Sequence, residues 1–252
     1  MTSPAAPKRP SRARASKPAP ARQESAPEPK GPPITLVIGT DTRVGKTWIT
    51  CALARALKDA GQSSIAVKPF EVGCGTTPGR REDGELLAEA TGQSAPRRAL
   101  VRLRAPLAVP AAADLEGVTL NYEAVLGQVR EFQRPDSFLL VEGVGGLLAP
   151  VTWDDDALDM IHSLNARVLV VAADRLGTIN HTLLTLRVLR SEKVPVLGVV
   201  LNQPVEPDES SPTNASAITR LSATDLIVRV PYLHDTEHAA EAMKEVAGWL
   251  LP

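Results

Sequence analysis

The chain has 252 residues, of which 43% are hydrophobic and 23% charged, and its formal net charge at pH 7 is -1. This length and composition allow one domain with a sizeable core. No apolar run reaches the about 18 residues that a membrane-spanning helix needs, so we expect no membrane partner.

The first 33 residues differ in composition from the rest of the chain. They hold seven Lys and Arg against Glu24 and Glu28, which leaves 21 basic and 27 acidic residues beyond them, so a +5 segment joins a -6 segment. Nine of the 22 prolines also fall here, with almost no aliphatic side chain larger than alanine. Such a segment cannot bury a core, and we expect residues 1–33 to form a disordered basic tail and residues 34–252 to form the domain.

The tail does not resemble a targeting signal. It lacks the continuous apolar stretch of a signal peptide, and its repeated prolines prevent the amphipathic helix of a transit peptide. We therefore expect a cytoplasmic protein. Because the domain is mildly acidic, we expect no nucleic-acid partner for it, although the basic tail could bind polyanions weakly.

Residues 35–47 hold the strongest motif in the chain. A β-branched apolar run breaks into a turn bounded by Gly39 and Gly45 and continues into Lys46 and Thr47 as a helix start. Backbone N–H groups of such a loop and the positive end of the helix dipole bind phosphate. The lysine lies along the β and γ oxygens, and the threonine hydroxyl is a Mg2+ ligand. A chance Gly-Lys-Thr is the alternative, but the order of strand, loop and helix favours a P-loop.

This P-loop is one residue longer than the standard form, because five residues separate Gly39 from Gly45. The longer spacing is typical of a limited branch of the nucleotide-binding proteins, which narrows the range of functions.

Downstream of this loop, apolar periodicity predicts alternating helices and strands. We expect helices at 48–60, 83–91, 119–132, 154–162, 177–192 and 238–251, and strands at 64–67, 137–141, 167–172, 196–201 and 226–230. Residues 97–113 mix apolar residues with Arg and Pro and are expected to be irregular. The alternation predicts an α/β fold with a doubly wound, mostly parallel sheet of about seven strands, helices on both faces, and ligands along the carboxyl edge.

Three ionisable residues are expected near that edge. Lys68 follows the strand 64–67, and its alternative interpretation is a solvated lysine at a strand end. Asp83 stands at the start of a helix, where an acidic N-cap would explain it structurally. Glu142 follows four apolar residues and precedes a glycine-rich segment, as in a Walker B element whose carboxylate holds Mg2+.

Other catalytic arrangements find little support. The four histidines lack metal-ligand spacing, no Gly-x-Ser-x-Gly elbow occurs, and Cys51 and Cys74 form no ligand pair or disulfide framework. The start of the helix at residue 177 adds a second N-terminus suited to an anion.

Taken together, these motifs resemble the dethiobiotin synthetases, a P-loop NTPase family, from about residue 34 to the C-terminus. The resemblance rests on residues 39–47, on Lys68-Pro69, on residues 141–146 and on residues 176–182. It implies an ATP- and Mg2+-dependent cyclo-ligase that acts on 7,8-diaminononanoate and CO2. An amine of the diamine forms a carbamate, which attacks the γ phosphorus of ATP, and the second amine closes the ring to give dethiobiotin, ADP and phosphate.

The resemblance also implies a role for each motif residue. Lys46 and Lys68 are the implied catalytic cations, and Thr47, Asp83 and Glu142 the implied metal ligands. The implied nucleotide-binding residues are Thr42, Arg43, Val44, Gly45, Lys46, Thr47, Trp48, Asp83, Glu142, Gly143, Val144, Gly145, Asn202, Pro231, Tyr232 and Leu233. The implied substrate-binding residues are Val72 and, from the partner subunit of a homodimer, Gly177, Thr178, Ile179 and Asn180.

Two positions depart from the family pattern. Val72 stands where the family has Thr or Ser, which removes one hydroxyl expected to bind substrate, and Arg43 stands where Glu or Gly is commoner. A backbone N–H or Thr76 could replace the lost hydroxyl. We expect Val72 to affect substrate affinity more than chemistry, since one neutral hydrogen bond contributes about 0.5 to 1.5 kcal/mol.

Three other interpretations remain. A partitioning or scaffold ATPase switch shares this branch of P-loops, but it usually carries a second lysine at the start of the loop, where this chain has Gly39, Thr40 and Asp41. The synthetase domain of a corrinoid amidase shares the loop too, but no glutaminase domain follows. A paralogous synthetase for a different acid is the third.

Overall fold

A computed structural model of the chain describes residues 31–222 and 224–251, so the predicted tail lies almost wholly outside the described residues. The strands are β1 (Thr35–Gly39), β2 (Ser63–Val67), β3 (Phe70–Val72), β4 (Val101–Leu103), β5 (Ser137–Glu142), β6 (Arg167–Ala173), β7 (Val196–Asn202) and β8 (Ile227–Val230). The helices are α1 (Lys46–Asp59), α2 (Asp83–Thr91), α3 (Val109–Glu116), α4 (Tyr122–Glu131), α5 (Ala157–Leu164), α6 (Thr178–Ser191), α7 (Ser211–Ser222), α8 (Thr236–Ala242) and α9 (Lys244–Leu250).

The central sheet is parallel throughout, in the order β2-β5-β1-β6-β7-β8. Each crossover between neighbouring strands passes through a helix, as parallel pairing requires. This confirms the predicted doubly wound α/β fold. The sheet has six strands rather than about seven, since β3 and β4 pair with each other in a separate two-stranded sheet.

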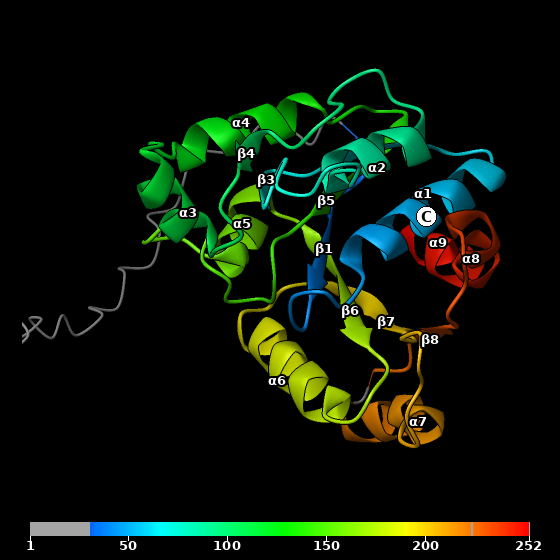
Figure 1. Ribbon diagram of the computed structural model, residues 1–252. Coiled ribbons are helices and arrows are strands. Elements are labelled where there is room, and N and C mark those ends of the chain that lie inside the picture. Colours follow the sequence, from blue (N-terminus) through cyan, green and yellow to red (C-terminus); the bar gives the residue numbers. More distant parts are fainter. Residues whose placement is uncertain (1–30, 223, 252) are drawn as a thin grey trace, which may run out of the picture.

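Alternating side chains of the strands build a core on each face of the sheet. In β1, Val37 faces the cluster that includes α1, α2, α8 and α9, while Leu36 and Ile38 face the cluster that includes α4, α5, α6 and α7. Figure 1 shows these two helical layers, with the blue α1 and red α9 together on one side of the sheet and the yellow-green α6 on the other. The apolar runs of the strands are therefore buried on both faces, as expected for a parallel sheet.

The segment predicted to be irregular, residues 97–113, contains regular structure. It forms β4 and the start of α3, where Pro110 occupies one of the first two helical positions. A proline is tolerated there because the N–H that it lacks has no partner inside the helix. The prediction was wrong because Pro and Arg conceal short elements that become stable only by packing on a third, small core around Phe70 and Leu103.

Other boundaries also shift. The predicted closing helix is two helices, α8 and α9, with Met243 as the N-cap residue of α9. The helix α5 begins at Ala157 rather than at residue 154, because the Asp156 side chain accepts hydrogen bonds from the N–H groups of Leu158 and Asp159. The helix α7 was not predicted.

Backbone hydrogen bonds join the loops at the carboxyl edge to the ends of neighbouring strands. Gly39 donates to the carbonyl of Gly145 at 3.2 Å, Gly143 donates to Val37 at 2.9 Å, and Thr40 donates to Val171 at 2.9 Å. A Cβ on Gly39 would lie 2.9 Å from the Gly145 carbonyl oxygen, so this approach requires glycine. In the part of the chain that the structure describes, no helix has the length and apolar character needed to cross a membrane.

Candidate functional site

The first helix starts directly from the glycine-bounded loop. Gly45 is its N-cap residue at φ 92°, a left-handed conformation that favours glycine, and it accepts the first helical hydrogen bond from Ile49. The remaining first-turn amides have no partner inside the helix and are open to an anion. This is the geometry that the motif predicted.

Lys46 lies within this loop, with 8% of its surface exposed, and its Nζ donates to the Asp41 carbonyl at 3.3 Å. Its pKa is lowered to about 8, chiefly by burial and then by the charge of Lys68, while Glu142 acts in the opposite direction. A bound polyphosphate would supply the negative charge that stabilises its ammonium form.

Lys68 lies between the two predicted metal-binding carboxylates. Its Nζ donates to Asp83 Oδ2 at 2.9 Å and to Glu142 Oε1, which also accepts from Thr47 Oγ1 at 2.8 Å. Lys68 is 5% exposed and Glu142 fully buried, so these charges interact in a poorly solvated site. Four predicted site residues from four separate parts of the chain therefore meet at one point.

The charges in this cluster shift one another's pKa. Burial acts to lower the pKa of Lys68, but Glu142 and Asp83 outweigh it and raise that pKa. Burial acts to raise the pKa of Asp83, and the Lys68 charge with its hydrogen bond outweighs it and lowers that pKa. The Lys68 ammonium and the Asp83 carboxylate are consequently held in their ionised forms.

The same cluster fits a divalent cation. Thr47, Asp83 and Glu142 offer a hydroxyl and two carboxylates, the oxygen donors that Mg2+ prefers. Among the described residues, Glu142 Oε2 is buried without a hydrogen-bond partner, and a buried carboxylate oxygen without a partner is unfavourable unless something binds it. These three residues could hold Mg2+ beside the phosphate loop.

The predicted nucleotide-binding residues on β7 and β8 lie at the same edge of the sheet. Asn202 ends β7, donates from Nδ2 to the Val44 carbonyl at 3.1 Å, and packs on Gly45 so closely that a Cβ there would lie 2.1 Å from that nitrogen. Its Oδ1 is left to accept a hydrogen bond. In the pairing of β7 with β8, Asn202 lies opposite Val230, which brings residues 231–233 to this edge, with Tyr232 43% exposed.

The other predicted residues of the phosphate loop are mostly accessible. Thr42 and Arg43 are exposed, and Trp48 is half-buried against the core that contains α1. Arg43 has φ 57°, a left-handed conformation that is uncommon for residues other than glycine. Gly145 accepts from Gly39 at the start of the loop and Gly143 donates to Val37 in β1, while Val144 packs on the small core beside β3.

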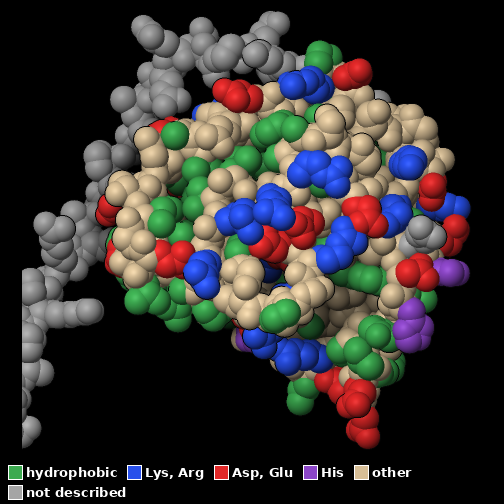
Figure 2. Space-filling model, turned by 45° about the horizontal axis from the view of Figure 1, so that its top comes forward, with side chains coloured by type: hydrophobic (Ala, Val, Ile, Leu, Met, Phe, Trp, Pro, Cys, Tyr) green, Lys and Arg blue, Asp and Glu red, His purple; other side chains and the backbone are tan. Residues whose placement is uncertain are grey.

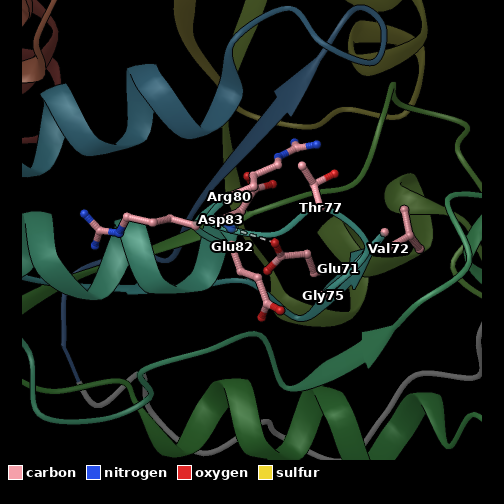
Figure 3. A pocket seen from close by; sticks show the side chains of 9 residues that line it. Glu71, Val72, Gly75, Thr77, Arg80, Glu82 and Asp83 are labelled. Atoms are coloured by element: carbon pink, nitrogen blue, oxygen red, sulfur yellow. Dashed lines mark hydrogen bonds between the residues drawn. The ribbon is translucent and has the colours of Figure 1, made fainter.

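The predicted substrate-binding residues of one chain separate into two places. Val72 lines a pocket with Glu71, Thr77, Arg80 and Asp83, as Figure 3 shows. Thr178, in the first turn of α6, lines a different pocket with Thr40 and Asp41 of the phosphate loop. Gly177 at φ 92° is the N-cap residue of α6. Thr76, a possible replacement for the missing hydroxyl, instead donates to the Gly73 carbonyl at 2.8 Å.

Glu71 lies beside this cluster but is not among the predicted site residues. Its carboxylate accepts from the backbone N–H groups of Asp83, at 2.6 Å, and Gly84, at 3.1 Å. The sequence offered one signal that could have identified Glu71, namely an acidic residue three positions after the strand-end lysine Lys68. The contact across twelve residues is visible only in the folded chain.

Basic and acidic side chains are interleaved on the surface around α2. Ion pairs join Arg81 to Glu89, Arg98 to Glu85 and Arg102 to Glu82. On the face shown in Figure 2, Lys and Arg side chains likewise lie among Asp and Glu rather than in a field of one sign.

Comparison with known proteins identifies similar sequences and one informative fold. A family described as an AAA domain matches residues 35–240. An ATP-dependent dethiobiotin synthetase BioD of Anaeromyxobacter dehalogenans (strain 2CP-1 / ATCC BAA-258) is 39% identical over 216 residues, covering 84% of this chain and 96% of the relative. The enzyme of the same description from Aquifex aeolicus is 36% identical, covering 86% and 96%. The cell division ATPase MinD of Pyrococcus furiosus shares the fold, with a TM-score of 0.52 at 18% identity over 86% of this chain and 98% of that one.

Proposed function

The chain belongs to the ATP-dependent dethiobiotin synthetase family, and on this basis we propose that it forms dethiobiotin from 7,8-diaminononanoate, CO2 and ATP. The observation that carries the proposal is the meeting of Lys68, Asp83, Glu142 and Thr47 beside the phosphate loop. A triphosphate and a carbamate are both anions, so their reaction needs cations between them, and this cluster can supply these cations.

In the proposed reaction, an amine of the substrate attacks CO2 and loses a proton, which gives a carbamate. A carbamate oxygen attacks the γ phosphorus, and ADP leaves. The second amine then attacks the carbonyl carbon of the mixed anhydride and phosphate leaves, which closes the ureido ring. No protein nucleophile is needed, so the enzyme's contribution is positioning and charge stabilisation.

We assign the phosphates to the first-turn amides of α1 and to Lys46. Its ammonium, now hydrogen-bonded to the Asp41 carbonyl, is close enough to the loop to turn toward bound phosphate. Thr47, Asp83 and Glu142 would hold Mg2+, which when bound neutralises charge that develops on the phosphate oxygens. Asn202 Oδ1 would accept a hydrogen bond from the amino group of adenine.

We assign the carbamate to Lys68. Its ammonium is buried and held charged by Asp83 and Glu142, so it is available as a cation without a change in protonation. Its Nζ, which shares Glu142 Oε1 with the Thr47 hydroxyl, would donate to a carbamate oxygen. Dependence on ATP also supports a cytoplasmic location.

We further propose that two subunits complete each site. Val72 and Thr178 of one chain line different pockets, which supports substrate-binding residues 177–180 coming from the partner subunit of a homodimer. The first-turn amides of α6 would then bind the substrate carboxylate.

Mixing two inactive variants tests the shared site. Lys46→Ala removes the phosphate contact, and Asn180→Pro removes a first-turn amide of α6, where proline is tolerated in a helix. Unfolded and refolded together in equal amounts, they should form mixed dimers in which one of two sites is intact, and about a quarter of the wild-type activity should return. If each chain holds a complete site, mixing restores nothing.

The reaction itself is tested by supplying the purified protein with ATP, Mg2+, bicarbonate and 7,8-diaminononanoate. We expect dethiobiotin, identified by mass, and one phosphate released for each ring closed. ATP hydrolysis that ignores the diamine but responds to DNA or a partner protein would contradict the proposal and favour an ATPase switch. A synthetase for another acid would show phosphate release with that acid alone.

A further inference from the structure

Glu71, in β3, holds the first turn of a helix that lies twelve residues further along the chain. One carboxylate oxygen accepts from the Asp83 N–H at 2.6 Å and the other from the Gly84 N–H at 3.1 Å. Figure 3 shows the Glu71 side chain directed at the start of α2. The side chain is 7% exposed, so these two bonds form away from most solvent.

This contact is separate from the helix's own cap. Glu82 is the N-cap residue of α2, and its N–H is bonded by the side chain of Glu85 at 3.3 Å. Glu71 binds the next two amides, which have no acceptor inside the helix. A carboxylate that accepts from both amides fixes the orientation of the first turn as well as its position.

Close packing makes this arrangement rigid. A Cβ on Gly84 would lie 2.4 Å from the backbone nitrogen of Ala99, so the helix start lies directly against the segment before β4. This contact requires the absence of a side chain at Gly84. Asp83 therefore has little freedom to move as long as Glu71 holds its amide.

The segment that contains Lys68 and Glu71 holds Asp83 at two points. Lys68 Nζ lies 2.9 Å from the Asp83 carboxylate, while Glu71, three residues later, holds the Asp83 backbone. We propose that Glu71 is a positioning residue for the metal, because it sets the Asp83 carboxylate opposite Glu142 and Thr47 so that all three can bind one divalent cation with the nucleotide. This inference rests on the proposed function only in taking Asp83 as a metal ligand.

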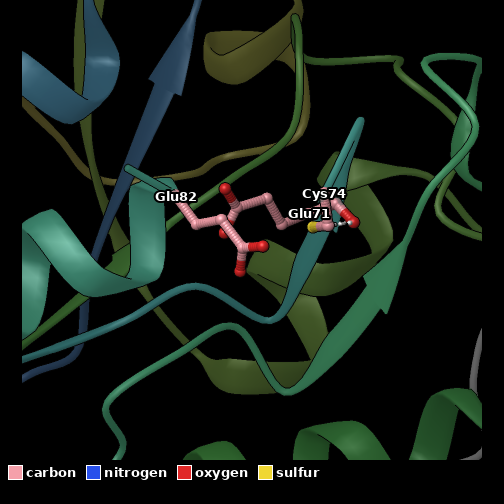
Figure 4. Close-up of side chains that lie close together, drawn as sticks. All are labelled: Glu71, Cys74 and Glu82. Atoms are coloured by element: carbon pink, nitrogen blue, oxygen red, sulfur yellow. Dashed lines mark hydrogen bonds between the residues drawn. The ribbon is translucent and has the colours of Figure 1, made fainter. Parts of the chain in front are cut away.

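A direct metal-binding role for Glu71 is not supported. Glu71, Cys74 and Glu82 each have a potential ligand atom within 4.8 Å of the others, and Figure 4 shows them together. All three are engaged elsewhere, since Glu71 accepts the two amides, Cys74 Sγ lies 3.6 Å from the Glu71 carbonyl, and the Glu82 carboxylate pairs with Arg102 at 2.6 Å.

The test compares Glu71→Gln with Glu82→Gln, which removes the same charge one residue before Asp83 without touching its amide. In Glu71→Gln, the side-chain NH2 group takes the place of one carboxylate oxygen and faces a backbone N–H donor of α2 instead of accepting from it. We measure Mn2+ binding by electron paramagnetic resonance in the presence of saturating ADP, and ADP binding by calorimetry in EDTA. Glu71→Gln should weaken Mn2+ binding by about 10- to 100-fold and leave metal-free ADP binding unchanged. Glu82→Gln should change neither.

Equal Mn2+ affinity in Glu71→Gln and the wild type would overturn the inference. A loss of metal-free ADP binding as large as the loss of Mn2+ binding would also overturn it, because it would indicate a general structural role. If Glu71→Gln does not fold, Glu71→Asp keeps the charge but shortens the side chain by one methylene, and the same Mn2+ deficit is expected. Folded Glu71→Asp with normal Mn2+ binding would also reject the inference.

These measurements use no diamine, so they separate the inference from the proposed function. Dethiobiotin formation can fail while the Mn2+ deficit stands. Conversely, if Asp83→Asn binds Mn2+ as well as the wild type does, Asp83 is not a ligand and the inference fails, whatever product is formed.

Discussion

At the scale of single residues, the two buried lysines differ in what they contact. Lys46 belongs to the phosphate loop and has a lowered pKa, whereas Lys68 is held charged between two carboxylates. Two cations of similar burial are therefore suited to different steps, one to ground-state phosphate binding and the other to charge that develops later.

Replacing each lysine by alanine should separate these roles. Lys46→Ala should lower ATP affinity about tenfold or more together with turnover, since it removes a charged contact to phosphate. Lys68→Ala should lower kcat by about 100-fold with a modest change in ATP affinity. Calorimetry and steady-state kinetics check this, with Lys58→Ala, an exposed lysine of α1, as the control. Equal and mild effects on turnover would remove Lys68 from the mechanism.

Val72 is the residue at which this chain departs from its family on the substrate side. It lines the pocket that contains Asp83, where we propose that the substrate binds. Val72→Thr is nearly isosteric and should lower the KM for the diamine by about 1 kcal/mol, roughly fivefold, without a matching change for ATP. Val72→Ala, which removes both methyl groups and adds no hydroxyl, is the control. Unchanged or worse diamine kinetics in Val72→Thr would mean that the pocket serves a more apolar ligand.

At the scale of elements, side-chain oxygens accept hydrogen bonds from the first-turn N–H groups of several helices. Asp156 caps α5 with bonds to Leu158 and Asp159 at 2.9 and 3.1 Å, Asn121 caps α4 through Ala124, and Glu71 reaches α2 from another element. The first two stabilise a helix end locally. The contact from Glu71 additionally fixes one element relative to another, which only a folded chain can do.

The contribution of the α5 N-cap to the free energy of unfolding can be measured. Asp156→Ala removes the oxygen that accepts both hydrogen bonds and should lower the free energy of unfolding by about 1 kcal/mol, as judged from urea denaturation. Asp156→Asn keeps an oxygen acceptor and should stay close to the wild type. A loss of equal size in both variants would assign the effect to charge rather than to hydrogen bonding.

At the scale of the whole molecule, the parallel order β2-β5-β1-β6-β7-β8 brings distant segments to one edge. The loop after β5 is joined by backbone hydrogen bonds to the end of β1, from which the phosphate loop starts, because the two strands are neighbours. The loop after β7 joins the same edge, where Asn202 donates to Val44. The site is therefore a consequence of strand order, and the ligands of an open parallel sheet bind where this order brings the loops together.

The boundary of the domain is also testable at this scale. The Pro32 carbonyl accepts from Gln133 Nε2 at 3.2 Å, and the Ile34 side chain is buried. A chain that begins at Gly31 should keep the activity and melting temperature of the full chain, because the preceding sequence has few apolar side chains to bury. A chain that begins at Thr35 should melt at a lower temperature, since it loses Ile34. Loss of activity or solubility in the chain that begins at Gly31 would reveal a role for the tail.

The sequence by itself determined the phosphate loop and the parallel α/β class, and its family resemblance named Thr47, Asp83 and Glu142 as candidate ligands. The loop follows from local order, since a β-branched run, a glycine-bounded turn and a helix start identify one another within a few residues. The tertiary structure alone decided that Lys68 lies between two carboxylates, that residues 97–113 form β4 and the start of α3, and that Glu71 holds Asp83. Each of these depends on contacts between segments far apart in the chain, and the spacing of residues within a segment carries no information about such contacts.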